Sequence, residues 1–113
     1  MVKVVFIGGF AYGKVVYDYL KQNKFVELGL SITYPDNSAN AESGNFSNDE
    51  NLLKDISANK YIGEIKKYDP DYIFVSGWSE LLNAELTQCA RKGAIGFHPS
   101  KLPNDRGRSV LAW

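Results

Sequence analysis

The chain opens with an apolar run that ends in two glycines. Residues 2–7 are apolar apart from Lys3, and Gly8 and Gly9 follow directly. Runs of this kind are typical of strands buried on both faces of a parallel sheet. From Tyr12 onward apolar residues recur at helical spacing, which predicts a helix with one buried side. The residues expected on that side are Val15, Val16, Tyr19 and Leu20.

The stretch that follows predicts a strand and then a long connection. Residues 26–34 are apolar enough for a second strand, and Pro35 ends it. Residues 35–48 are rich in Asn and Ser and hold almost nothing that a core could bury. We therefore expect a surface loop there, which either closes over a ligand or is disordered.

The middle of the chain carries two helical patterns. Asn48 or Asp49 is placed to cap a short helix. The apolar residues of that helix are Leu52, Leu53 and Ile56. Apolar residues then recur at helical spacing from Tyr61 to Tyr68, and Pro70 marks the boundary because proline cannot continue a helix.

The remainder predicts two more strands and two more helices. Residues 72–75 and residues 94–98 are apolar runs that suit buried strands. Between them we expect a helix from Asn83 to Gly93. Its apolar side consists of Leu86, Cys89 and Ala90. Ser109 is expected to cap a further helix that has scarcely begun where the sequence stops.

Alternating strands and helices predict an α/β protein with an open, mostly parallel, Rossmann-like sheet flanked by helices. With 113 residues there is room for one domain. Ligands of such folds bind beyond the carboxyl ends of the strands. A sheet of four strands followed by one helical turn would leave apolar surface and an edge uncovered. We therefore expect a fragment, with a homo-oligomer as one way to cover the edge.

Composition excludes several classes of protein. Hydrophobic residues make up 44% and charged residues 23%, which is typical of a globular domain. Thirteen basic residues balance thirteen acidic ones without a basic run, so nucleic-acid binding is not expected. No apolar run approaches the roughly 20 residues that cross a membrane. The single cysteine favours a reducing compartment, so we expect a cytoplasmic protein.

The glycine turn after the first strand nearly matches two phosphate-binding signatures. The dinucleotide signature needs a glycine where Phe10 stands. The nucleoside-triphosphatase signature is met by Gly8, Gly13 and Lys14, but Val15 replaces the hydroxyl residue that holds magnesium. A helix N-terminus still favours an anion, so substrate binding and a plain turn both stay open. The candidate substrate-binding residues are Gly9, Phe10 and Gly13.

Two further segments fall at the same predicted edge of the sheet. Trp78, Leu81 and Leu82 follow the third strand and could line a flat apolar pocket, although leucines before a helix are more often core. His98, the one histidine, ends the fourth strand. No second ligand at metal-binding spacing accompanies it, so we expect no metal site. At a ligand edge an imidazole can serve as acid, base or hydrogen-bond donor.

The residues from His98 onward carry a more specific signal. Residues 98–107 read His-Pro-Ser-Lys-Leu-Pro-Asn-Asp-Arg-Gly, which resembles the His-x-Ser-x-Leu-Pro-x-x-Arg-Gly signature of the folate-dependent formyltransferase family. That family includes methionyl-tRNA formyltransferase, glycinamide ribonucleotide formyltransferase and the nucleotide-sugar N-formyltransferases. Residues 69–73 and 77–79 also match family elements. The resemblance implies the formyltransferase fold, with residues 1–113 as the N-terminal part of the catalytic domain.

The resemblance also implies a reaction and roles for particular residues. In the family an amine attacks the formyl carbon of N10-formyltetrahydrofolate, and a histidine, here His98, donates to the oxygen on which negative charge develops. Residues 78–82 would border the pterin pocket, and Leu102 and Pro103 would shape the loop beneath it. The family's asparagine is replaced by Gly96, and its catalytic aspartate lies farther downstream than this sequence reaches. We therefore expect this chain alone to be weakly active or inactive.

The acceptor is the least determined part of this interpretation. Residues 77–79 and the Arg106-Gly107-Arg108 sequence favour the branch that modifies amino sugars on nucleotides. The expected partner is thus a small-molecule amine, without membrane or nucleic acid. Three alternatives stay open: the catalytic half of methionyl-tRNA formyltransferase, a non-catalytic module that holds folate or nucleotide, and a nucleoside-triphosphate switch built on Gly13 and Lys14.

Overall fold

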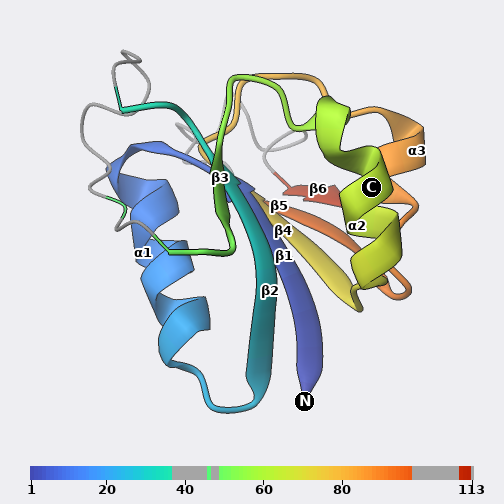
Figure 1. Cartoon of the computed structure of the whole chain (residues 1–113), viewed down its shortest axis with the longest axis horizontal. Helices are drawn as coiled ribbons and strands as arrows, with labels where there is room; N and C mark the ends of the chain where they lie inside the picture. The colour runs from blue at the N-terminus through green and yellow to red at the C-terminus, as the bar shows by residue number, and fades with distance from the viewer. Residues whose placement is uncertain (37–45, 47–48, 98–109, 113) are drawn as a thin grey trace.

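A single six-stranded sheet organises the computed structural model, which describes residues 1–36, 46, 49–97 and 110–112 (Figure 1). The strands lie in the order β3-β2-β1-β4-β5-β6. They are β1 (Val2–Gly8), β2 (Val26–Thr33), β3 (Leu52–Lys54), β4 (Tyr72–Ser76), β5 (Gly93–Phe97) and β6 (Val110–Ala112). The first five are parallel, and β6 is antiparallel to β5. The predicted α/β class with a mostly parallel sheet is confirmed.

Helices cover the sheet on both faces. They are α1 (Phe10–Gln22), α2 (Ile62–Tyr68), preceded by the 3-10 turn η2 (Asn59–Tyr61), and α3 (Ala84–Thr87). In Figure 1, α1 lies on one side of the sheet and α2 and α3 lie on the other. Val4 and Phe6 of β1 pack under α1, whereas Val5 and Ile7 pack with α2 and α3. None of the described helices is long and apolar enough to cross a membrane.

The buried side of α1 differs from the predicted one. Its buried residues are Gly13, Tyr17 and Leu20. Val15 and Tyr19, expected to be buried, are 69% and 65% exposed. The rotation of α1 follows from its close approach to β4, because a Cβ added at Gly13 would lie 2.7 Å from the carbonyl oxygen of Ser76. Contact between backbones therefore outweighs the apolar pattern of the helix.

Phe46 corrects the prediction that residues 35–48 hold nothing to bury. Its side chain is 9% exposed and belongs to the core under α1. Its ring centroid lies 5.1 Å from that of Tyr17 and 6.1 Å from that of Phe6. One aromatic residue thus anchors a polar segment whose other residues between 37 and 48 lie outside the described structure.

Strand β3 replaces the short helix predicted near Asp49. Residues 52–54 pair in parallel with residues 31–33 of β2. Backbone hydrogen bonds flank the pairing, since Ser31 N donates to Asn51 O at 2.9 Å and Asp55 N donates to Thr33 O at 2.9 Å. The edge of β2 has backbone N–H and C=O groups that need hydrogen-bond partners. The hydrogen bonds that residues 52–54 form with it stabilise a strand more than a short helical pattern stabilises a helix.

Two predictions near the C-terminus are also wrong. The helix expected to reach Gly93 is the single turn α3, and Gly93 instead opens β5 with a φ of 135°. Residues 110–112 form β6 where the sequence predicts a helix capped by Ser109. Sheet pairing again decides the outcome, because β6 hydrogen-bonds along β5. The described sheet therefore has six strands rather than four.

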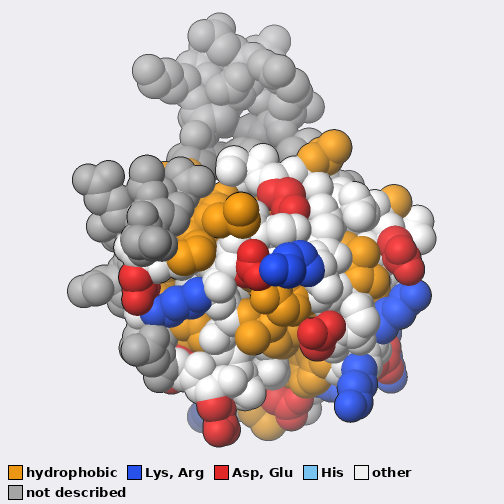
Figure 2. All heavy atoms as spheres, turned by 45° about the horizontal axis from the view of Figure 1, so that its top comes forward, with side chains coloured by type: hydrophobic (Ala, Val, Ile, Leu, Met, Phe, Trp, Pro, Cys, Tyr) orange, Lys and Arg blue, Asp and Glu red, His pale blue; other side chains and the backbone are white. Residues whose placement is uncertain are grey.

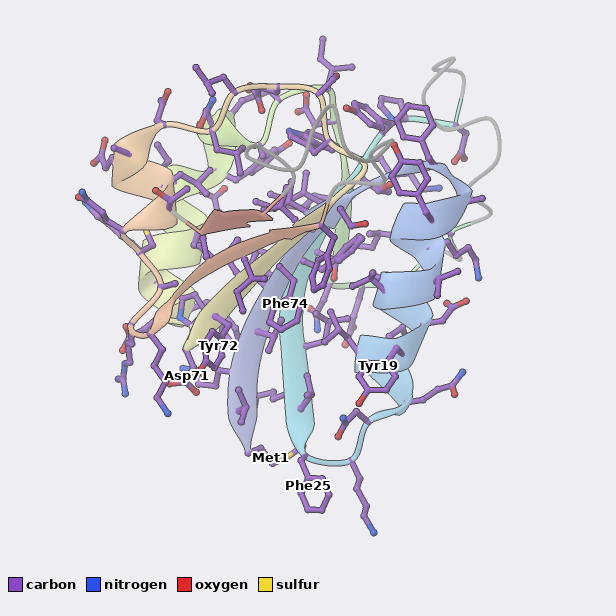
Figure 3. The ribbon with its side chains drawn as sticks, turned by 180° about the vertical axis from the view of Figure 1, so that it is seen from behind. Met1, Tyr19, Phe25, Asp71, Tyr72 and Phe74 are labelled. Atoms are coloured by element: carbon purple, nitrogen blue, oxygen red, sulfur yellow. The ribbon has the colours of Figure 1, made fainter. Side chains whose placement is uncertain are left out.

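The face that carries α1 is covered only in part. Among the described residues no helix lies over β4 and β5 on this face, where Tyr72 and Phe74 project from β4 (Figure 3). Both side chains are half-buried, and their ring centroids are 6.1 Å apart. Phe97, whose ring centroid is 5.8 Å from that of Phe74, is 41% exposed. Within the described residues, these three rings of β4 and β5 therefore extend the apolar layer of this face beyond α1.

Glycines fasten the β1–α1 turn to the end of β4. A Cβ added at Gly8 would lie 2.0 Å from the carbonyl oxygen of Ser76. Gly77 has a φ of 74°, and a Cβ there would lie 2.2 Å from the carbonyl oxygen of Gly9. Gly9 N donates a hydrogen bond to that Ser76 oxygen at 3.0 Å. The two strand ends thus meet backbone to backbone, with no room for side chains between them.

Replacing Gly77 by alanine tests this junction. Gly77→Ala should lower the free energy of unfolding by about 2–4 kcal/mol, because a side chain at positive φ is strained and the new methyl group overlaps the Gly9 carbonyl. The measurement is urea unfolding followed by circular dichroism. Gly63→Ala is the matched control, since a Cβ added at Gly63 of α2 meets no atom within 4 Å. It should be neutral or stabilising by up to about 1 kcal/mol. Equal stability of the two variants would contradict the tight junction.

Candidate functional site

The carboxyl ends of β1, β2, β4 and β5 meet at one edge of the sheet, which is uppermost in Figure 1. This is the edge at which open α/β sheets bind ligands. Three described segments follow these strand ends: the β1–α1 turn, the segment after β2 and the segment after β4. Figure 2 brings this edge forward and shows hydrophobic side chains interleaved with charged ones.

A row of four aromatic rings crosses this edge. Phe10 stacks on Tyr12 with centroids 5.6 Å apart and meets Tyr34 edge-on at 6.1 Å. Tyr34 in turn stacks on Trp78 at 4.2 Å. Such ring pairs are worth about 0.5–1.5 kcal/mol each beyond the area they bury. The row joins the three segments, and it runs from Tyr12, which is 41% exposed, to Tyr34 and Trp78, which are buried.

Phe10 has a strained backbone. Its φ is 61°, in the left-handed region where bulky residues are rarely found. The contacts of its ring with Tyr12 and Tyr34 hold it there. Phe10 stands where the dinucleotide signature has its second glycine, and it takes a glycine-like conformation while its ring occupies the neighbouring space. Strain of about 1–3 kcal/mol is characteristic of functional turns.

The other candidates of the β1–α1 turn make backbone contacts. Gly9 N donates to Ser76 O, and Gly13 N donates to Gly9 O at 3.1 Å. The ammonium group of Lys14 pairs with Asp18 at 2.6 Å, one turn along the helix. Substrate binding by Gly9, Phe10 and Gly13 stays a prediction.

The segment after β4 separates into buried and exposed side chains. Trp78 is 8% and Leu82 is 7% exposed, and both belong to the core shared with α2 and α3. Leu81 is 84% exposed. Of these three predicted cofactor-binding residues, Leu81 is therefore the one whose side chain is open to a ligand. Their role in cofactor binding stays a prediction.

Sequence reasoning missed the two residues that hold this segment in place. The hydroxyl of Tyr34 accepts a hydrogen bond from Ser79 N at 2.8 Å and pairs with Ser79 Oγ at 3.0 Å. The carboxylate of Glu80 faces Trp78 and residues 57–58, which precede η2. A single acid between tryptophan and two leucines was the available sequence signal, since an isolated charge in an apolar segment needs partners.

The carboxylate of Glu80 is partly buried and is surrounded by hydrogen-bond donors. Burial raises its pKa, but the hydrogen bonds from Ser57, Trp78 and the backbones of Ala58 and Asn59 together outweigh burial and hold the pKa below its usual range. Donors gathered on one carboxylate favour its charged form and hold the side chain in one orientation.

His98, Leu102 and Pro103 lie outside the described residues. Phe97, the residue before His98, ends β5 at the carboxyl edge. Gly96, at the position of the family's asparagine, pairs with Val75 of β4 and has no side-chain donor. Among the residues with described positions, no group of three His, Cys, Asp or Glu could hold a metal ion.

A pocket of about 320 Å³ lies elsewhere, between α1 and the start of β2. Its lining includes Tyr17, Lys21, Leu28 and Asp49 and none of the predicted site residues. Tyr17 and Lys21 both donate to one oxygen of Asp49, at 2.5 Å each. Hydrogen bonding by Lys21 and Tyr17 lowers the pKa of Asp49, so these three side chains of the pocket already pair with one another.

Comparisons with known proteins agree on one family. The model of the formyl transferase family matches residues 2–113. Glycinamide ribonucleotide transformylase 1 from Geobacillus kaustophilus superposes with a TM-score of 0.57 at 16% identity, over 91% of this chain and 61% of that chain. Phosphoribosylglycinamide formyltransferase from Bacillus halodurans superposes with a TM-score of 0.57 at 15% identity, over 89% of this chain and 58% of that chain. Phosphoribosylglycinamide formyltransferase from Campylobacter jejuni superposes with a TM-score of 0.56 at 18% identity, over 98% of this chain and 70% of that chain.

These three structures are less than 20% identical in sequence to this chain, so the likeness shows a shared fold and nothing about substrates. The chain spans 61% and 58% of the length of the first two structures. The shared part includes the carboxyl edge described above, since all five parallel strands lie within the matched residues.

The hydroxyl of Tyr34 can be tested apart from its ring. Tyr34→Phe keeps the stack on Trp78 but leaves Ser79 N without its acceptor, so the free energy of unfolding should fall by about 1–2 kcal/mol. Urea unfolding followed by circular dichroism measures this loss. Tyr12→Phe is the control from the same aromatic row, and because Tyr12 is 41% exposed it should change stability by less than about 0.5 kcal/mol. A similar loss in both variants would mean that the hydroxyl of Tyr34 holds nothing.

Proposed function

The chain belongs to the formyl transferase family, and from this premise we propose that it is the N-terminal part of a domain that transfers a formyl group from N10-formyltetrahydrofolate to a primary amine. The observation that carries the proposal is the family match over residues 2–113, which contains the His98 motif. In the reaction the amine nitrogen bonds to the formyl carbon, and the bond from that carbon to N10 breaks. The proton lost by the amine ends on N10, so atoms and charge balance.

The proposed catalytic residue is His98. Its imidazole would donate a hydrogen bond to the formyl oxygen as negative charge develops there, a contribution of about 3–4 kcal/mol for a well-placed donor. Because Gly96 lacks the amide of the family's asparagine, a backbone N–H group or water would have to supply the second donor. With one of the family's side-chain donors missing, we propose weak activity or none for these residues alone.

The proposed donor pocket lies along the segment after β4. Leu81 offers an exposed apolar side chain, and Trp78 and Leu82 form a fixed wall behind it. A flat, partly apolar pterin suits such a surface. Leu102 and Pro103 are proposed as further contacts on the strength of the motif alone. On the other side of the edge, the N-terminus of α1 at Gly9, Phe10 and Gly13 is proposed to face an anionic part of the acceptor.

The proposed acceptor is an amino sugar attached to a nucleotide. The Gly-Trp-Ser sequence at residues 77–79 and the Arg-Gly-Arg sequence at residues 106–108 support this choice. The competing acceptor is glycinamide ribonucleotide, which the names of the similar structures suggest. We also propose a cytoplasmic protein that needs neither nucleic acid nor membrane, with a second copy as one means of covering a sheet edge.

Substitution of His98 tests the reaction. With N10-formyltetrahydrofolate and a panel of amino-sugar nucleotides and glycinamide ribonucleotide, the complete gene product should formylate one acceptor, detected by mass spectrometry. His98→Asn should lower kcat by about 10²- to 10³-fold, because it removes the donor to the formyl oxygen. Lys67→Ala, an exposed change on α2, should leave kcat unaltered. A His98→Asn variant with full kcat would contradict the assignment.

Leu81 tests the donor pocket. Leu81→Ala should raise KM for the formyl donor about 5- to 20-fold, because it removes the exposed apolar contact. Stability should change by less than about 0.5 kcal/mol, since the side chain is 84% exposed. Phe25→Ala is a matched control at the opposite end of the sheet, where Phe25 is 67% exposed (Figure 3). An unchanged KM in Leu81→Ala would place the donor elsewhere.

A further inference from the structure

Glu80 turns its carboxylate toward the protein, although it stands next to the exposed Leu81. Its Oε1 accepts hydrogen bonds from the backbone N of Ala58 at 2.7 Å and from the indole Nε1 of Trp78 at 3.1 Å. Its Oε2 accepts one from the hydroxyl of Ser57 at 2.6 Å. One carboxylate thus joins the segment after β4 to the residues that precede η2, more than twenty positions earlier in the chain.

A second set of hydrogen bonds crosses the same junction beyond Leu81. The side-chain amide of Asn59 donates to the carbonyl oxygen of Leu81 at 3.0 Å. Its oxygen accepts a hydrogen bond from the backbone N of Asn83 at 2.8 Å. Leu81 is therefore bracketed by anchored residues, with Glu80 on one side and the buried Leu82 on the other.

Packing alone does not account for this arrangement. Trp78 and Leu82 already lie in the core shared with α2 and α3. The cross-links go further and fix the backbone around a leucine whose own side chain contacts little of the protein. A rigid segment that presents an exposed apolar residue loses little conformational freedom when a ligand binds, which is the physical basis of preorganisation.

We propose that Glu80 is a positioning residue for the formyl donor: by holding Trp78, Ser57 and Ala58 with one carboxylate, it fixes the backbone that presents Leu81 to the pterin. This inference rests on the proposed function and assigns to a residue outside the His98 motif a part in donor affinity. Glu80 does not touch the reacting atoms, so its effect falls on KM for the donor and not on kcat.

The decisive variant is Glu80→Gln, which keeps the shape of the side chain but removes its charge and replaces one acceptor oxygen with an NH₂ group. In the complete gene product it should raise KM for N10-formyltetrahydrofolate about 5- to 20-fold, with kcat changed by less than about twofold. Ser57→Ala removes one donor and should give a smaller rise. Glu64→Gln is the control, because Glu64 is an exposed acid of α2.

A spectroscopic measurement tests the positioning without any ligand. Residues 1–113 hold two tryptophans, so Trp113→Phe, combined with Phe at any tryptophan that the complete gene product carries elsewhere, leaves Trp78 as the fluorophore. In that background Glu80→Gln should shift the emission of Trp78 and speed hydrogen exchange of the Leu81 amide, whereas Glu64→Gln should do neither. Glu80→Asp keeps the charge and should recover part of the exchange protection.

The outcomes separate the two levels of inference. If the unaltered protein neither binds nor uses the formyl donor, the proposed function fails, while Trp78 emission and Leu81 exchange still judge whether Glu80 fixes the segment. If the unaltered protein uses the donor and Glu80→Gln has the same KM, the positioning role is overturned. A loss of stability with KM unchanged would also overturn it, because Glu80 would then be merely structural.

Discussion

The architecture depends on the contact between the β1–α1 turn and the end of β4. The carbonyl oxygen of Ser76 accepts a hydrogen bond from Gly9 N, and it lies where side chains at Gly8 or Gly13 would have to be. Gly77 takes a positive φ on the other side of the same contact. Because backbone meets backbone here, the start of α1 and the exit from β4 cannot move independently. This contact sets which face of α1 is buried and places Phe10 beside Tyr34 at the carboxyl edge.

From that contact the candidate site is built outward in layers. The aromatic row links the turn after β1 to Trp78, and the Tyr34 hydroxyl fixes Ser79. Glu80 then connects this segment to Ser57 and Ala58. Each step fixes backbone rather than filling a cavity. The result is an edge whose described residues are linked by hydrogen bonds and ring contacts and on which the side chain of Leu81 is 84% exposed.

The proposed formyl transfer has two kinds of support, which are the match to the formyl transferase family and the geometry of this edge. The family match extends over the residues that carry the His98 motif, whereas the described structure concerns the surface on the β1, β2 and β4 side of it. The motif supports a reaction at a carbonyl group. In the proposed function, the flat formyl donor would bind against the described edge. Gly96 in β5 pairs with Val75 of β4 and supplies no side-chain donor.

The sequence by itself determined the strands whose signal is strong and local. Residues 2–7, 26–33 and 72–75 became strands, as predicted to within one residue, because apolar runs ended by glycine or proline have few alternatives in a buried sheet. The sequence also determined the family through the His98 motif. Tertiary structure decided what depended on distant partners: β3 and β6 formed on strand edges that no local pattern reveals, and contact with β4 rotated α1. It likewise divided the segment after β4, burying Leu82 and exposing Leu81, because only the assembled core distinguishes these two leucines, which are neighbours in the chain.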